Sequence, residues 1–146
     1  NERAKFPSKK PILLKVSPDL SPEQLNQTID AAEEAGVDGY IATNTTTGRN
    51  NLKTKKSELE KIGRGGLSGK PLRDVSTEVI RFINQKLDGK KPIIGVGGIF
   101  TPMDALEKLE AGASLVQVYT GFIYEGPFIV KRINKLLINK MFNTYI

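Results

Sequence analysis

Two glycine-containing segments of the chain could bind phosphate. They are residues 95–99 (GVGGI) and residues 119–121 (YTG). Glycines allow a backbone to approach phosphate oxygens closely, and a threonine hydroxyl adds a donor. The first segment matches the dinucleotide pattern G-x-G-x-x-G poorly, because Phe100 stands where the last glycine is expected. Close packing of a strand on a helix would also explain the glycines, but two such segments together favour phosphate binding.

Two polar side chains stand near the ends of other apolar runs. Lys15 lies near the end of residues 12–16 (ILLKV), and Asn44 follows the next run. A desolvated lysine needs an anionic or electron-rich partner, such as a reduced flavin, but a lysine that extends into water explains the position equally well. The Asn44 amide could pair with the amide-and-carbonyl edge of a pyrimidine ring. Closure of a turn is the alternative, and it is favoured for Thr46 and Thr47.

A third glycine-rich segment, residues 65–71 (GGLSGKP), precedes an apolar helical pattern. It is not a phosphate-binding loop of the Walker type, because Lys70 is followed by Pro71 rather than by serine or threonine. Its backbone could approach a planar or anionic ligand closely. From the residues alone, a flexible hinge is the preferred interpretation.

The composition excludes several classes of chemistry. The 146 residues include no cysteine and no histidine, so a disulfide framework, a thiolate metal site and a histidine base are all absent. Without histidine, Ser17 or Ser68 is improbable as a nucleophile, and no carboxylates converge in a metal-binding pattern. The net charge of +6 is scattered. It predicts a solvated surface rather than a nucleic-acid site, since no basic stripe with aromatic residues is present.

Apolar runs alternate with helical patterns along the whole chain. Strands are expected at residues 12–16, 39–43, 92–96 and 114–119. Helices are expected at residues 21–36, 75–87 and 101–112 and after Pro127, with capping boxes that begin at Ser21 and Thr101 and a stop at Gly36. The polar stretch of residues 44–71 is long for a passive connector and is expected to be functional or mobile.

This alternation predicts an α/β fold with a parallel sheet. Two arrangements fit: an open doubly wound sheet, or part of a (β/α)8 barrel, in which about 250 residues are typical. In both arrangements ligands bind at the carboxyl ends of the strands, where the polar and glycine-rich segments lie.

Five motifs in the same order resemble dihydroorotate dehydrogenase, specifically its quinone-linked class. The resemblance runs from about Pro11 to Leu137 and rests on residues 14–20 (LKVSPDL), 42–46 (ATNTT), 65–72 (GGLSGKPL), 93–99 (IIGVGGI) and 112–119 (GASLVQVY). The resemblance implies that the chain is the C-terminal half of an FMN-binding (β/α)8 barrel, with strands five to eight. Residues 1–10 would be a linker from the N-terminal half.

The resemblance also implies roles for single residues. FMN would be held by Lys15, Thr43, Gly69, Gly98, Tyr119 and Thr120, with the last three at its phosphate. Asn44 and Thr45 would bind dihydroorotate or orotate. No catalytic residue is expected in this chain, because the family's serine base stands on a loop before the segment that matches Pro11 onward.

The implied activity is oxidation of dihydroorotate to orotate, with electrons passed through FMN to a quinone, in de novo pyrimidine (UMP) biosynthesis. Peripheral association with the bacterial cytoplasmic membrane or the mitochondrial inner membrane is implied, through the same absent part that would contact the quinone. A half barrel alone would expose its edge strands and is expected to be inactive, or to dimerise. The alternative function is a non-catalytic half barrel that binds a phosphate or nucleotide and closes by self-association.

Overall fold

The computed structural model describes residues 10–50 and 52–143, so nearly all of the expected linker, residues 1–10, lies outside the described part. Four parallel strands form one sheet: β1 (Leu13–Val16), β2 (Gly39–Ala42), β3 (Ile93–Val96) and β4 (Leu115–Gln117). Their order in the sheet is the same as their order in the chain. Each strand lies within a run expected from the sequence and is shorter by one to three residues.

The register between strands aligns residues that face the same side of the sheet. Lys15 pairs with Ile41, Ile41 with Ile94, and Ile94 with Leu115. Within the described residues, β1 pairs only with β2, and β4 pairs only with β3. Both outer strands therefore present an unpaired edge, as expected for part of a barrel.

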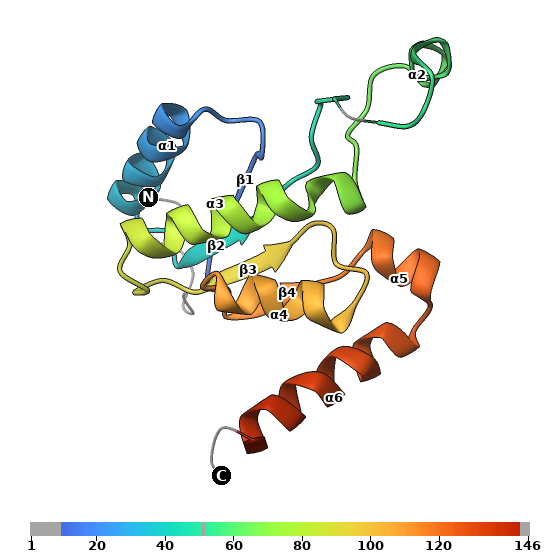
Figure 1. The fold of residues 1–146 in the computed structure, drawn as a ribbon. Helices are drawn as coiled ribbons and strands as arrows, with labels where there is room; N and C mark the ends of the chain where they lie inside the picture. Colours follow the sequence, from blue (N-terminus) through green and yellow to red (C-terminus); the bar gives the residue numbers. More distant parts are fainter. Residues whose placement is uncertain (1–9, 51, 144–146) are drawn as a thin grey trace.

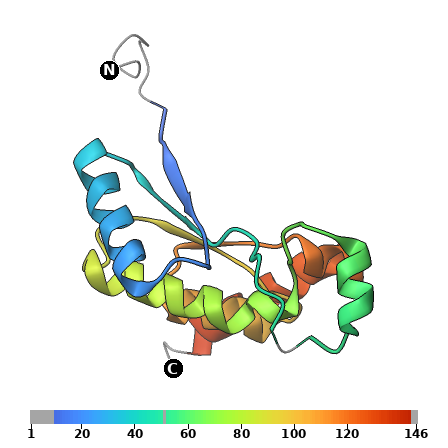
Figure 2. The ribbon, with the colours of Figure 1, turned by 90° about the horizontal axis from the view of Figure 1, so that it is seen from above.

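The helices between the strands cover one face of the sheet (Figures 1 and 2). These helices are α1 (Pro22–Ala35), α3 (Arg73–Lys86) and α4 (Pro102–Glu110). The capping boxes expected at Ser21 and Thr101 are both present, and Gly36 ends α1 in the left-handed conformation with φ 74°. Helix α3 begins at Arg73, two residues before the expected start, after a 3-10 turn, η2 (Lys70–Leu72).

The core lies between the sheet and these helices. Tyr40 and Ile93 point from the strands toward Ile29 and Ile80, and all four are almost fully buried. The Tyr40 hydroxyl donates to Glu33 Oε1 at 2.8 Å, which satisfies the polar end of a buried ring.

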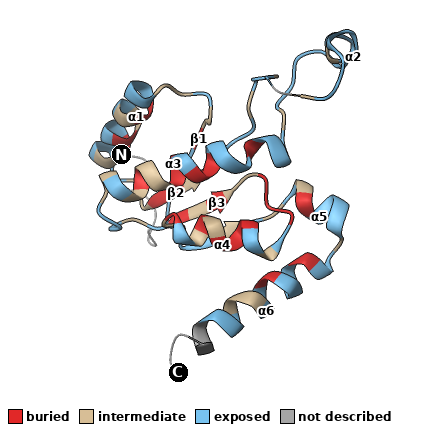
Figure 3. Ribbon diagram, in the orientation of Figure 1, coloured by how far each residue is buried: buried red, intermediate tan, exposed pale blue. Residues whose placement is uncertain are grey.

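The opposite, concave face of the sheet is much less covered (Figure 3). Leu115 is 64% exposed, Lys15 and Gln117 are exposed, and Ile41 and Ile94 are only partly buried. An open doubly wound sheet has helices on both faces. Helices on one face, with strands in chain order, instead form four consecutive units of a (β/α)8 barrel.

Two short helices were not expected from the sequence. Residues 44–71 contain α2 (Lys56–Ile62), which has no buried residue and projects from the body of the molecule (Figure 1). The two ends of this excursion meet where Thr46 pairs with Leu67 in an antiparallel bridge. Helix α5 (Thr120–Glu125) occupies the expected connector before α6 (Phe128–Asn143). Neither α2 nor α5 buries a continuous apolar stripe, so hydrophobic periodicity gives no signal for them.

Candidate functional site

A cavity of about 250 Å³ lies at the carboxyl ends of the four strands. All eight residues that the resemblance assigns to FMN or substrate line it: Lys15, Thr43, Asn44, Thr45, Gly69, Gly98, Tyr119 and Thr120. They come from segments up to about one hundred residues apart in the chain. The parallel sheet brings these segments together, because every parallel strand ends at the same edge.

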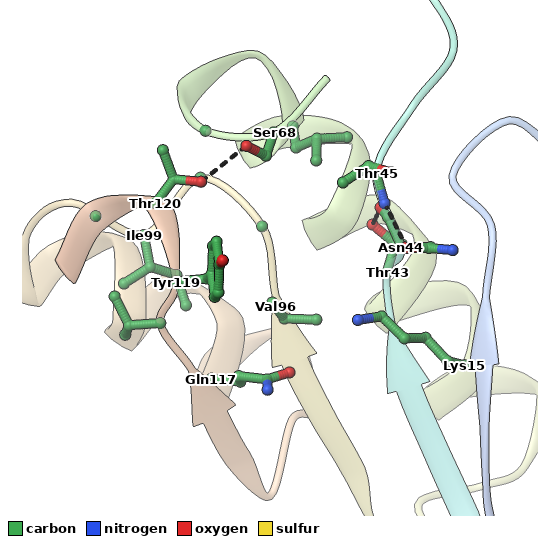
Figure 4. A pocket seen from close by; sticks show the side chains of 16 residues that line it. Lys15, Thr43, Asn44, Thr45, Ser68, Val96, Ile99, Gln117, Tyr119 and Thr120 are labelled. Atoms are coloured by element: carbon green, nitrogen blue, oxygen red, sulfur yellow. Dashed lines mark hydrogen bonds between the residues drawn. The ribbon is translucent and has the colours of Figure 1, made fainter. Parts of the chain in front are cut away.

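Lys15 extends from β1 past the end of β2 toward the cavity (Figure 4). It is exposed, and within the described residues no carboxylate lies within ion-pair distance of its Nζ. Its partner in the register, Ile41, places it on the concave face rather than among the helices. The structure thus presents a cation to the cavity, where an anionic or electron-rich ligand would compensate it.

Residues 43–45 continue β2 past its last paired residue. The Thr43 N–H donates to Val96 O at 2.9 Å, and the Asn44 N–H donates to Val16 O at 2.8 Å. These bonds attach the segment to both neighbouring strands, and the Ala42–Thr43 peptide bond is cis. The Asn44 side-chain oxygen accepts from the Thr45 N–H at 2.9 Å. The local turn therefore occupies one acceptor site of Asn44, and its amide NH2 group keeps its capacity to donate.

Asp19 supports this turn from outside the cavity. Its carboxylate accepts hydrogen bonds from the Thr46 hydroxyl and from the backbone N–H of Thr47, the latter at 2.7 Å. The Thr47 hydroxyl donates to the same carboxylate at 2.8 Å. The bonds from Thr46 and Thr47 lower the pKa of Asp19. Both threonines thus serve the turn, as their sequence position favours, although their partner is Asp19 rather than their own backbone alone.

The loop after β3 forms the wall opposite Lys15. Gly98 is buried and has a left-handed backbone with φ 71°, and an added Cβ would lie 2.5 Å from Arg73 Cα. Only glycine can occupy this position without displacing the start of α3. Among the described residues, the backbone N–H groups of Gly98 and Ile99 have no acceptor. Both residues line the cavity, where such N–H groups could bind an anion.

The segment after β4 closes the same side of the cavity. An added Cβ on Gly121 would lie 1.9 Å from Ile99 O, so the loops after β3 and β4 touch there through bare backbone. The Thr120 hydroxyl donates to Ser68 Oγ at 2.9 Å (Figure 4). Gly69, with φ 89°, brings the third glycine-rich segment against Thr120 Cγ2. All three glycine-rich segments therefore meet at one wall.

Part of the cavity lining is not predicted from the sequence. Gln117 and Ser68 line the cavity beside the eight expected residues, as do the apolar residues Leu72, Val96 and Ile99. Gln117 could have been found, since it stands two residues after Leu115 and strand side chains alternate. Ser68 gives no such signal, because its position depends on a loop path that no periodicity describes.

The described residues hold no cluster of three or more acidic or histidine side chains that could bind a metal ion. Over the same residues, none of the helices combines the length and the apolar character required to cross a membrane.

Residues 2–141 match the family model described as dihydroorotate dehydrogenase. The chain is 57% identical over 141 residues to the dihydroorotate dehydrogenase (quinone) of Christiangramia forsetii, covering 96% of this chain and 39% of that protein. It is 54% identical over 138 residues to the enzyme of the same name from Nostoc punctiforme, covering 90% and 36%. Each curated relative is thus matched over less than two fifths of its length.

The chain is also similar in structure to a solved member of this family. The crystal structure of dihydroorotate dehydrogenase from Eimeria tenella in complex with ferulenol superposes with a TM-score of 0.81 at 40% identity. The superposition covers 94% of this chain and 36% of that one.

Proposed function

The chain belongs to the dihydroorotate dehydrogenase family, and we propose that it forms part of the active site of a quinone-linked enzyme. One side of its cavity, the flavin-phosphate wall, would bind the phosphate group of FMN, and residues on the other side would bind the flavin ring and part of the substrate. The reaction is the oxidation of dihydroorotate to orotate, a step of de novo pyrimidine biosynthesis. The electrons pass through FMN to a quinone. The observation that carries the proposal is the convergence of three glycine-rich segments and Lys15 on one cavity.

The four βα units are proposed to be the fifth to eighth of the barrel. Residues 1–146 then make up the C-terminal half, with residues 1–10 as the connection from the N-terminal half. In (β/α)8 enzymes the loops after strands seven and eight commonly build a phosphate site. In this assignment those loops are the segments after β3 and β4, and these segments contain Gly98 and Thr120.

The residues at these two loops fit the phosphate group of FMN. The N–H groups of Gly98 and Ile99 have no acceptor within the described residues, and the Thr120 hydroxyl lies on the same wall. A phosphate group accepts hydrogen bonds from both kinds of donor. The absence of a Cβ at Gly98 lets this loop pack directly on the start of α3, and the exposed Tyr119 also lines the cavity.

The other side of the cavity fits a flavin ring. When bound, FMN supplies the acceptor for the two electrons removed from dihydroorotate. Lys15 presents a positive charge toward the cavity, which would stabilise negative charge at the pyrimidine edge of the ring. Thr43 is buried at the end of β2, and Gly69 exposes its backbone to the same cavity.

Asn44 and Thr45 are proposed to hold the substrate ring. Both are exposed at the end of β2, and the Asn44 amide NH2 group can donate to a substrate carbonyl. The Asp19 carboxylate fixes the following turn and so limits the directions that Asn44 can take. No residue of this chain is assigned as the base. By the family resemblance, that group is a serine that this sequence does not include.

The proposed electron acceptor and cellular location are those implied by resemblance to the quinone-linked class of the family. A quinone dissolves in a membrane, so we propose peripheral association with the bacterial cytoplasmic membrane or the mitochondrial inner membrane. No nucleic-acid partner is proposed.

The function is tested in a complete barrel. In a chimera, this chain replaces the matching 141 residues of the Christiangramia forsetii relative. We expect the purified chimera to retain FMN and to reduce a water-soluble quinone only when dihydroorotate is added. A folded chimera that holds flavin but does not oxidise dihydroorotate would refute the proposal that dihydroorotate is the substrate. A folded chimera without flavin would refute the cofactor site.

A further inference from the structure

Lys108 is a buried cation that the site described above does not use. It stands on α4 with no exposed surface, and it does not line the cavity. Lysine is almost never fully buried without a specific partner. The contacts of this side chain therefore show what it does for the surrounding fold.

The Lys108 amine binds the first turn of α3. Its Nζ donates to the backbone carbonyl of Arg73 and to the Thr77 hydroxyl, the latter at 2.5 Å. The Thr77 hydroxyl lies 3.0 Å from both Arg73 O and Glu107 Oε1. One ammonium group thus joins α4 to the first turn of α3 through polar atoms at the boundary between the two helices.

Arg73 is the residue on which the phosphate-facing loop rests. Its Cα and N would lie 2.5 Å and 2.6 Å from a Cβ on Gly98, so the loop touches the start of α3 directly. The Ser76 hydroxyl lies 3.1 Å from both Gly97 O and Arg73 O. A displacement of Arg73 would therefore move Gly97 and Gly98 together.

Asp104 holds the other end of the same loop. Its Oδ2 accepts from the N–H groups of Phe100 and Thr101 at 3.0 Å and 2.8 Å. Its Oδ1 lies 3.5 Å from an Arg73 guanidinium nitrogen. Residues 97–101 are thus fixed at both ends by a network that includes Arg73, Asp104 and Lys108.

We propose that Lys108 is a positioning residue for residues 97–101, and that it sets the affinity of this loop for the phosphate group of a flavin nucleotide. The inference rests on the proposed function for the identity of the ligand. Lys108 acts at a distance: it fixes Arg73 O and Thr77, and Arg73 supports Gly98. Gly98 lines the cavity, and its N–H group has no acceptor among the described residues. The charged groups that face Lys108 are Asp104 and Glu107 on α4 and Arg73 and Asp74 on α3.

The test compares two flavins that differ only at the phosphate. FMN and riboflavin are titrated into the apo chimera, and binding is followed by quenching of flavin fluorescence. We expect Lys108→Met to raise the dissociation constant of FMN roughly tenfold and to leave that of riboflavin nearly unchanged. Thr77→Val removes one partner of Lys108 with little change in volume, and we expect a smaller effect in the same direction.

Lys86→Met is the matched control. Lys86 is at the opposite end of α3, where its Nζ lies 2.6 Å from Asp30 and 2.7 Å from Asn26. This variant loses a comparable interhelical contact far from Gly98, so we expect both flavins to bind as they do to the wild type. Hydrogen exchange of residues 97–101 in the apo protein is the second readout, and we expect it to accelerate in Lys108→Met but not in Lys86→Met.

The outcomes separate the inference from the proposed function. Equal weakening of FMN and riboflavin, or unchanged exchange at residues 97–101, would overturn the positioning role. If the wild-type chimera binds no flavin, the proposed function and the ligand named here both fail. Exchange at residues 97–101 would then decide only whether Lys108 orders the loop. If Lys108→Met does not fold, Thr77→Val decides by the same two readouts.

Discussion

The Thr120 hydroxyl donates a hydrogen bond to Ser68 Oγ at 2.9 Å, although 52 residues separate the two in the chain. The bond joins the segment after β4 to the glycine-rich segment before α3. Both residues line the cavity, so the contact closes one side of the proposed flavin-phosphate wall. It also gives Thr120 a defined side-chain orientation on that wall.

Thr120→Val should weaken FMN binding more than riboflavin binding. The substitution keeps the shape of the side chain but removes the hydroxyl, which would donate to the phosphate in place of Ser68 Oγ when FMN binds. A hydrogen bond to a charged group contributes about 1.5–3 kcal/mol, so the dissociation constant of FMN should rise by at least about tenfold. Titration of FMN and of riboflavin into the apo chimera measures the two dissociation constants. Ser68→Ala is the control for loss of the Thr120–Ser68 bond alone, and an equal effect of the two variants would contradict a phosphate contact by Thr120.

Gly98→Ala should destabilise the fold and remove FMN binding together. An added Cβ would lie 2.5 Å from Arg73 Cα, and the backbone φ of 71° is unfavourable for alanine. Strain and overpacking together should cost about 2–4 kcal/mol of unfolding free energy, measured by urea denaturation. Gly36→Ala is the matched control, since it has φ 74° with no atom within 4 Å and should cost only about 1 kcal/mol. Equal costs for the two would show that the Gly98–Arg73 contact can relax.

The stability of the protein should depend on Lys108 at alkaline pH. Burial lowers the pKa of Lys108 to about 8, whereas an unfolded chain keeps this proton up to about pH 10.4. Between these values the unfolded state binds more protons, so the contribution of Lys108 to the unfolding free energy rises with pH. Relative to Lys108→Met, the wild type should therefore gain on the order of 2 kcal/mol between pH 7 and pH 10. Urea denaturation at both pH values measures this gain, and a constant difference would contradict it.

The isolated chain should self-associate and should not oxidise dihydroorotate. Leu115 is 64% exposed on the concave face, and β1 and β4 have unpaired edges within the described part. Exposed edges and an uncovered apolar face favour association. Sedimentation velocity across a range of concentrations measures it, and Leu115→Lys should reduce it. A monomeric sample with dihydroorotate-dependent activity would contradict this expectation.

Much of the fold follows from local patterns in the sequence. Ser21 and Thr101 predict two helix starts because a capping box satisfies the first backbone N–H groups locally. Each strand lies within an apolar run, but the run is longer than the strand by one to three residues. Ile12 and Ser114 lie just outside the paired strand residues, although the Ser114 N–H still donates to Ile93 O at 2.8 Å. Where the regular pairing stops is not visible in a sequence.

The candidate site could be predicted only in part. Lys15, Asn44 and the glycine-rich segments are candidates because they lie at or just after the ends of apolar runs, and the structure brings them to one cavity. The choice between a barrel and a doubly wound sheet depends on which face the helices cover, a tertiary property. The Lys108 network was missed for a similar reason. A lysine on an amphipathic helix is normally solvated, and only the packing of α4 on α3 shows that this one is buried.

The most direct test of the central claim is the visible absorption spectrum of the chimera after FMN has been added and the excess removed. We predict stoichiometric flavin absorbance in the wild type and a large loss in Lys15→Met, because the charge of this lysine points toward the cavity in which we propose the flavin ring binds. Lys90→Met, at an exposed lysine outside the cavity, should retain the full absorbance. A folded wild-type chimera without flavin absorbance, or a Lys15→Met variant that retains flavin fully, would contradict the account.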